Sequence, residues 1–209
     1  MGSMKQLMKS VVVVFAFVLV LPETALAAPP GSTVTYTPNY SYAFQNIYTT
    51  AEGINSATAS ASKSGLLKVS SSADCTTVPL CKDATAQGFA SAGATYRTKN
   101  GVSLKAIATF TVTDSFLNGG PGSFQGNRLS LHLASGTERS DCDQAAPDGV
   151  SSDAPVTVVL ECTLGPADGP SVRVYGSAST YSWDDIGDSF AATSRLSATL
   201  VSLQVGPQE

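Results

Sequence analysis

Hydrophobic and polar residues alternate with a period of two along much of the chain. In the segment 102–113 every second residue is apolar, from Val102 to Val112, and Ile107 is the one apolar residue between them. This alternation is typical of a β-strand that buries one face and exposes the other. The same pattern recurs in three further segments, which are 128–134, 156–162 and 172–178.

Two details of the alternation bear on how the predicted strands pack. Small residues occupy the buried positions of the segments 57–62 and 90–94, where alanines alternate mainly with Ser, Thr and Gly. Small side chains on a buried face allow the facing sheet to approach closely. In the last segment the alternation changes phase between Leu200 and Val201. This change predicts a β-bulge or, alternatively, a central strand buried on both faces.

Clusters of Gly, Pro and Asn separate the alternating segments. Asn100-Gly101 joins two of them and predicts a β-hairpin between the strands on either side. The connections are short, apart from helical turns expected at 83–87 and 184–192. The pattern amounts to roughly nine or ten strands in a single domain, residues 28–209. It predicts an all-β fold, an antiparallel β-sandwich of jelly-roll-like topology, with a closed β-barrel as the alternative.

The start of the sequence has the order of a secretory signal peptide. Lys5 and Lys9 precede an unbroken apolar run at 11–21, and a cleavage site of the A-x-A form ends at Ala27. The run is shorter than a bilayer-spanning helix, and no second apolar stretch of spanning length follows it. We therefore expect residues 1–27 to be removed, and the mature protein to be secreted into the extracellular space without a membrane span.

The cysteines support the same compartment. All four lie after the predicted leader, at Cys75, Cys81, Cys142 and Cys162. An even number of cysteines in an exported chain indicates disulfides. Of the three possible pairings we expect Cys75–Cys81 and Cys142–Cys162, because each closes a short loop. Zinc is a weak alternative, since the spacings are not C-x-x-C and the single histidine is remote.

Charge and composition narrow the range of functions. The chain has 12 Lys and Arg against 16 Asp and Glu, for a net charge of −4, so no nucleic-acid partner is expected. The single histidine, His132, alternates with leucines on a predicted strand, which favours a structural role over that of a catalytic base. The sequence therefore favours a binding or structural role over an enzymatic one. A secreted hydrolase with loop-borne carboxylates is the alternative.

Acidic residues form two clusters that could bind calcium in extracellular loops. The first has D-x-D spacing and a third aspartate before a glycine, and its candidate ligands are Asp141, Asp143 and Asp148. The second has its first and last carboxylates one helical turn apart, and its candidate ligands are Asp184, Asp185 and Asp188. Calcium binds six to eight oxygens from carboxylates and loop carbonyls. Weak calcium binding is thus the one cofactor interaction that the sequence predicts, and no cofactor is expected to be required.

Aromatic residues suggest where a ligand would bind. Tyr40, Tyr42 and Phe44 share one face of a predicted strand, and the only tryptophan is Trp183. Aromatic rings with a polar tip suit partly hydrated surfaces and can stack on the apolar faces of sugars. The predicted ligand-binding residues are therefore Tyr40, Tyr42 and Trp183, for an extracellular glycan or other cell-surface component. The whole sequence predicts a secreted, disulfide-stabilised binding or structural module that is carbohydrate-binding or adhesive.

Overall fold

The alternating segments form eleven β-strands in the part of the chain that the structure describes. The structure is a computed structural model and describes residues 34–36, 38, 40–49, 54–75, 83–120, 123–185 and 191–208. In chain order the strands are β1 (Val34–Tyr36), β2 (Tyr40–Thr49), β3 (Ile54–Ala61), β4 (Leu66–Asp74), β5 (Asp83–Arg97), β6 (Leu104–Asn118), β7 (Phe124–Ser135), β8 (Glu138–Ala145), β9 (Val156–Leu164), β10 (Ser171–Asp185) and β11 (Ala192–Pro207). These described residues include no helix that is long and apolar enough to cross a membrane.

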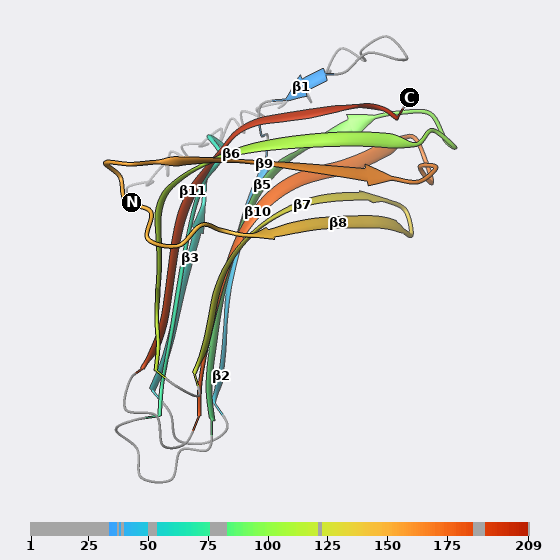
Figure 1. The fold of residues 1–209 in the computed structure, drawn as a ribbon. Coiled ribbons are helices and arrows are strands. Elements are labelled where there is room, and N and C mark those ends of the chain that lie inside the picture. Colours follow the sequence, from blue (N-terminus) through green and yellow to red (C-terminus); the bar gives the residue numbers. More distant parts are fainter. Residues whose placement is uncertain are drawn as a thin grey trace, which may run out of the picture.

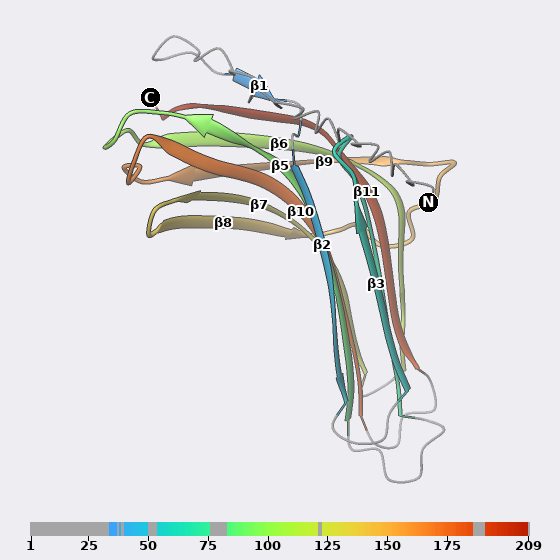
Figure 2. The same cartoon turned by 180° about the vertical axis from the view of Figure 1, so that it is seen from behind.

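The strands form two antiparallel sheets that pack face to face (Figure 1). One sheet has the order β3-β4-β11-β6-β9, and β1 pairs with β11 beyond the end of β4. The other has the order β2-β5-β10-β7-β8. Both sheets bend, and the views in Figures 1 and 2 agree that the second sheet lies on the inside of the bend. We call the first the convex sheet and the second the concave sheet.

The strand pairing is that of a jelly roll. The hairpin of β7 and β8 is enclosed by successive pairs β6 with β9, β5 with β10 and β4 with β11. This nested ribbon is rolled up so that β11 also pairs with β6, and β10 with β7. Strands β2 and β3 extend the two sheets at one edge. The predicted antiparallel β-sandwich is therefore confirmed, and the sheets do not close into the alternative barrel.

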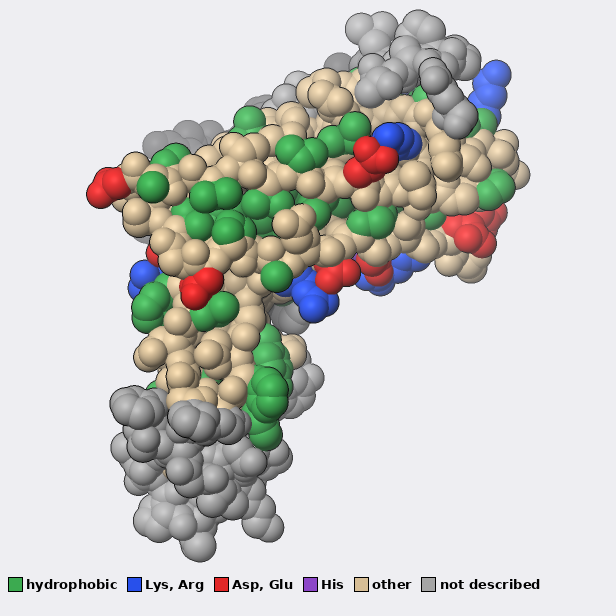
Figure 3. Space-filling view, viewed as in Figure 1, with side chains coloured by type: hydrophobic (Ala, Val, Ile, Leu, Met, Phe, Trp, Pro, Cys, Tyr) green, Lys and Arg blue, Asp and Glu red, His purple; other side chains and the backbone are tan. Residues whose placement is uncertain are grey.

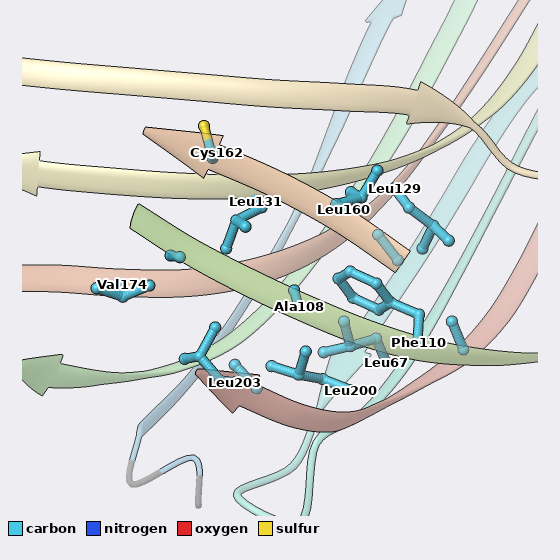
Figure 4. Packing of buried hydrophobic residues seen from close by; sticks show 14 of the residues in the cluster. Leu67, Ala108, Phe110, Leu129, Leu131, Leu160, Cys162, Val174, Leu200 and Leu203 are labelled. Carbon is cyan, nitrogen blue, oxygen red and sulfur yellow. The ribbon is translucent and has the colours of Figure 1, made fainter. Parts of the chain in front are cut away.

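The hydrophobic core lies between the sheets, where the apolar positions of the alternating segments meet. In β6 every second residue from Leu104 to Val112 is buried, as the sequence pattern predicts. Phe110 is the largest fully buried side chain. Figure 4 shows its ring among leucines of both sheets, including Leu129 and Leu200. Removing these side chains from water is the main favourable contribution to folding.

The phase change predicted in the last strand is a β-bulge. The register of β11 against β6 shifts between Leu200 and Ser202. The extra residue, Val201, is 60% exposed, whereas Leu200 and Leu203 on either side of it are buried. The bulge thus keeps the apolar residues on both sides of the phase change in the core, and it increases the local twist of the strand.

The bend divides the sandwich into two arms (Figure 1). Small side chains fill the space between the sheets in the arm that contains β3 and β4. Ser71 of β4 and Ser182 of β10 belong to facing sheets, and their hydroxyl oxygens are 2.9 Å apart. The Ser182 hydroxyl also lies 3.0 Å from that of Ser194 on β11. All three side chains are buried. The sheets therefore approach closely at these serines, and the buried hydroxyls satisfy one another.

A disulfide joins the edges of the two sheets. Cys142 of β8 and Cys162 of β9 are bonded, which confirms one of the two predicted pairs. Strand β8 is the edge of the concave sheet and β9 is the edge of the convex sheet, so the bond closes the sandwich on that side. The predicted pair Cys75–Cys81 stays a prediction, because Cys81 lies outside the described residues.

Two local predictions were wrong. Asn100-Gly101 is a turn, with Gly101 at a φ of 81°, but the strands on either side belong to different sheets and form no hairpin. The Gly101 N–H instead donates to the Ala167 carbonyl across the loop. A turn signal encodes a chain reversal and carries no information about which strands pair. The expected helical turn at 83–87 is part of strand β5, because pairing overrides weak local preference. The helical turn expected at 184–192 stays a prediction, because residues 186–190 lie outside the described residues.

Candidate functional site

The exposed face of the concave sheet gathers side chains of several chemical types, and we call it the concave face. Its strands pair in uninterrupted register, so positions on neighbouring strands line up in rows. One row contains Gly93, Tyr175, His132 and Asp141, and the next contains Tyr42, Ser91, Ser177, Ser130 and Asp143. Figure 3 shows hydrophobic side chains on the inner side of the lower arm and charged side chains along the underside of the upper arm.

His132 of β7 links side chains from both neighbouring strands. Its Nδ1 lies 2.6 Å from Oδ1 of Asp141 on β8, and its Nε2 lies 2.9 Å from Oγ of Ser177 on β10. Because a carboxylate can only accept, Nδ1 donates to Asp141, while Nε2 is hydrogen-bonded to the Ser177 hydroxyl. The ring of Tyr175 stacks on His132, with the ring centroids 4.5 Å apart. These contacts fix the side chains of three strands relative to one another.

The order Ser177–His132–Asp141 is that of a catalytic triad, but its surroundings are not those of an active site. Ser177 is only 1% exposed, so its hydroxyl is closed to a substrate. It also lies in the middle of β10, between β5 and β7. The backbone N–H groups around it therefore belong to the sheet rather than to an oxyanion hole. We interpret the array as structural, in line with the role favoured for His132 by the sequence.

The charged side chains beside this array are paired with one another. Arg128 Nη1 lies 2.7 Å from Oδ2 of Asp143, and Arg139 Nε donates to Oδ2 of Asp141 over 2.7 Å. Desolvation raises the pKa of Asp141, but the hydrogen bonds and charges of His132 and Arg139 outweigh it. The pKa of Asp141 therefore lies below its ordinary value. These pairs leave little uncompensated charge on this part of the face.

A groove of about 580 Å³ opens on the concave face next to the paired charges. Its lining combines aromatic rings with amide, hydroxyl and guanidinium groups, chiefly those of Phe89, Phe124, Tyr181, Gln87, Ser179 and Arg128. Gly126 also lines the groove, and a Cβ built on it would meet no atom within 4 Å. The lack of a side chain at Gly126 therefore keeps the groove open.

The groove is built on rigid elements. Asn127 of β7 points into the sandwich, where its amide donates to the Ser115 hydroxyl over 3.0 Å and to the Arg195 carbonyl over 2.7 Å. These bonds tie the strand beneath the groove to the convex sheet. At one end of the groove the ring of Phe124 packs against Trp183, with centroids 5.2 Å apart. Strand-borne side chains held in this way are preorganised for a ligand.

The structure brings two of the three predicted ligand-binding residues to this face. Tyr42 of β2 and Trp183 of β10 lie on the same side of the concave sheet. Tyr42 is 59% exposed, and Trp183 is half-buried against Phe124. The backbone of Tyr40 pairs with Gly93 on the same sheet, but the Tyr40 side chain lies outside the described residues.

The carboxylates of the first predicted calcium site each have another partner. Asp141 and Asp143 bind the side chains described above, and Asp148 accepts the Leu117 N–H over 3.1 Å. In the second cluster Asp184 is fully buried and accepts the Cys75 N–H over 2.7 Å. Asp188 and the side chain of Asp185 lie outside the described residues. The described residues contain no group of three metal-ligating side chains, and calcium binding stays a prediction.

Much of the groove was not identifiable from the sequence. Phe89, Phe124, Tyr181 and Gly126 come from three strands that lie far apart in the sequence. One signal was available, because Phe89 and Tyr181 alternate with residues that the pattern places in the core. Each was therefore identifiable as exposed, but their grouping depends on the register between strands, which the pattern does not contain.

Comparisons with known proteins add no relative. No protein-family model matches the chain, and no curated protein sequence matches it. The concave face is therefore interpreted from its own geometry and chemistry.

Proposed function

We propose that this protein is a secreted carbohydrate-binding module that holds a glycan in the groove of the concave face. The observation that carries the proposal is the lining of the groove, where Phe89, Tyr181 and Phe124 stand with the amide of Gln87 and the hydroxyl of Ser179. Aromatic rings stack on the apolar faces of sugar rings, while amides and hydroxyls bind the sugar hydroxyl groups. A mixed lining of this kind suits a ligand with both kinds of surface.

The chemistry of the groove favours binding over hydrolysis. Glycoside hydrolysis requires two carboxyl groups on opposite sides of the scissile bond. Among the residues that the structure describes, those that line the groove include no Asp or Glu. Asp143, two residues from Ala145 in the lining, is held by Arg128. A role in retention or adhesion therefore fits the site better than a role in cleavage.

The predicted route of export is compatible with this role. A leader at residues 1–27 would direct the chain out of the cell, where extracellular glycans are found. The Cys142–Cys162 disulfide is stable in such an oxidising compartment. Both observations support secretion as part of the proposal.

Binding of the mature chain to a glycan array and to insoluble polysaccharides tests the proposal. The informative variant is Gly126→Leu, which places a side chain in the groove where the protein leaves room for it. We expect it to abolish binding without loss of stability. The matched control is Gly165→Leu, at an exposed glycine outside the groove that also has open space around it. Retention of every glycan by Gly126→Leu, or binding to none by the wild type, contradicts the proposal.

A further inference from the structure

Four aromatic residues form a diagonal line across the concave face. We define the aromatic strip as Tyr42 of β2, Phe89 of β5, Tyr181 of β10 and Phe124 of β7. The register places these four positions on adjacent strands and on the same side of the sheet. The strip extends beyond the groove, because Tyr42 is not among the residues that line it.

The steps of the strip are regular. Tyr42 pairs with Ser91, which lies two residues from Phe89, and Phe89 pairs with Ser179, two residues from Tyr181. Tyr181 in turn pairs with Gly126, two residues from Phe124. Each step therefore moves to the neighbouring strand and two residues along it, so that consecutive positions of the strip are about 8 Å apart. The whole strip spans about 25 Å by the same strand geometry.

The rings of the strip are accessible at both ends. Tyr42 is 59% exposed and Phe124 is 63% exposed, while Tyr181 between them is 36% exposed. These three are among the exposed large hydrophobic side chains of the described residues. Isolated exposed hydrophobic residues are ordinary, but an ordered series on one face marks a binding surface.

The charges beside the strip indicate that its ligand is neutral. Arg128, the one charged residue among the described residues of the groove lining, is held by Asp143. Arg139 is likewise held by Asp141. An anionic ligand would have to displace these carboxylates, whereas the amide of Gln87 can bind neutral hydroxyl groups without any rearrangement of charge.

We infer that the aromatic strip binds an extended, neutral polysaccharide that lies diagonally across the strands. This inference rests on the proposed function and adds the ligand class, its direction and its length. A short sugar occupies only the groove, between Phe89 and Phe124, whereas a longer chain also reaches Tyr42. Affinity therefore increases with chain length until the ligand covers the strip.

Calorimetric titration with soluble cello-oligosaccharides and chito-oligosaccharides, as dimers and as hexamers, tests this inference. For whichever series binds, Tyr42→Ala should lower the affinity for the hexamer about fivefold, which corresponds to the loss of one ring contact. The affinity for the dimer should fall much less, because the dimer does not reach Tyr42. The control is Phe116→Ala, which removes an exposed ring of the convex sheet and should leave both affinities unchanged.

The outcomes separate this inference from the proposed function. If Gly126→Leu abolishes binding of both lengths but Tyr42→Ala affects neither, the groove binds sugars and the extended strip is wrong. If no oligosaccharide binds the wild type, the proposed function itself fails. Tighter binding to an acidic polysaccharide such as alginate would contradict the inference that the ligand is neutral. Preferential binding to immobilised gelatin would show that the strip binds a polypeptide and not a polysaccharide.

Discussion

Gly176 of β10 lies directly against the ring of Phe110 across the sandwich. A Cβ built on Gly176 would come within 2.6 Å of Cζ of Phe110 and within 3.1 Å of a methyl carbon of Leu200. Both of these partners are buried in the convex sheet. The glycine thus provides the space that the largest side chain of the core occupies.

Gly176→Ala should therefore destabilise the protein. The added methyl group must push the Phe110 ring or the strand aside, and overpacking of this kind costs about 1–3 kcal/mol. The matched control is Gly126→Ala in β7, where the new Cβ meets no atom within 4 Å. Urea unfolding of both variants measures the difference. Equal stability of the two variants would show that the core around Phe110 yields more easily than its close packing implies.

Loss of the Cys142–Cys162 disulfide should lower the free energy of unfolding by about 3 kcal/mol, the value for a loop of this length. The two cysteines are 20 residues apart in the sequence and hold the edges of the two sheets together. The double variant Cys142→Ala, Cys162→Ala is compared with the wild type in urea. If the bond acts on the unfolded chain, the dependence of the free energy on urea should also steepen, because the unfolded chain becomes more expanded. An unchanged midpoint would contradict the prediction.

The buried serines between the sheets should contribute more to stability than exposed ones. The Ser182 hydroxyl donates to the Ser71 carbonyl over 3.1 Å and lies within 3.0 Å of the hydroxyls of Ser71 and Ser194. Ser182→Ala leaves these groups with fewer partners in a buried site, at a cost of about 1–3 kcal/mol. Ser60→Ala, at an exposed serine of β3, is the control and should change the stability by less than about 0.5 kcal/mol. Similar melting temperatures of the two variants would contradict this interpretation.

The fold was largely predictable from the sequence because its signal is local. Alternation from Leu104 to Val112 places the buried face of a strand, and a change of phase at Val201 places a bulge. Pairing was not predictable in the same way. Asn100-Gly101 looks like a hairpin turn, yet it connects two sheets, because β5 pairs with β10 and β2 rather than with β6.

The candidate site was predictable only in part for the same reason. The sequence places His132 on the face opposite the leucines of its strand, and Tyr42 on one face with Tyr40 and Phe44. It does not show that Ser177 is the partner of His132, or that Tyr181 continues a line that begins at Tyr42. Both relationships require the register of β10 between its two neighbours. Register is set by the whole buried face of a strand rather than by the residues that use it.

The contacts of Asp141 predict how stability depends on pH. The pKa of Asp141 is held below its ordinary value of about 3.9 by His132 and Arg139, although desolvation opposes them. The unfolded chain therefore takes up a proton first as the pH falls. The stabilisation is complete above the ordinary pKa and is lost as the pH falls through the lowered value. Because the Asp141 side chain is 40% exposed, solvent screening limits the effect to about 1 kcal/mol.

Asp141→Asn should therefore be less stable than the wild type near neutral pH, and the difference should shrink as the pH falls below about 4. Thermal or urea unfolding at a series of pH values measures this difference directly. Asp153→Asn, at an exposed aspartate of the β8–β9 loop, is the control and should differ little from the wild type at any pH. The contrast is informative because both variants remove one negative charge, so an effect of net charge alone would appear in both. A difference for Asp141→Asn that stays constant from neutral to acidic pH would mean that the shape of the side chain, rather than its ionisation, stabilises the array.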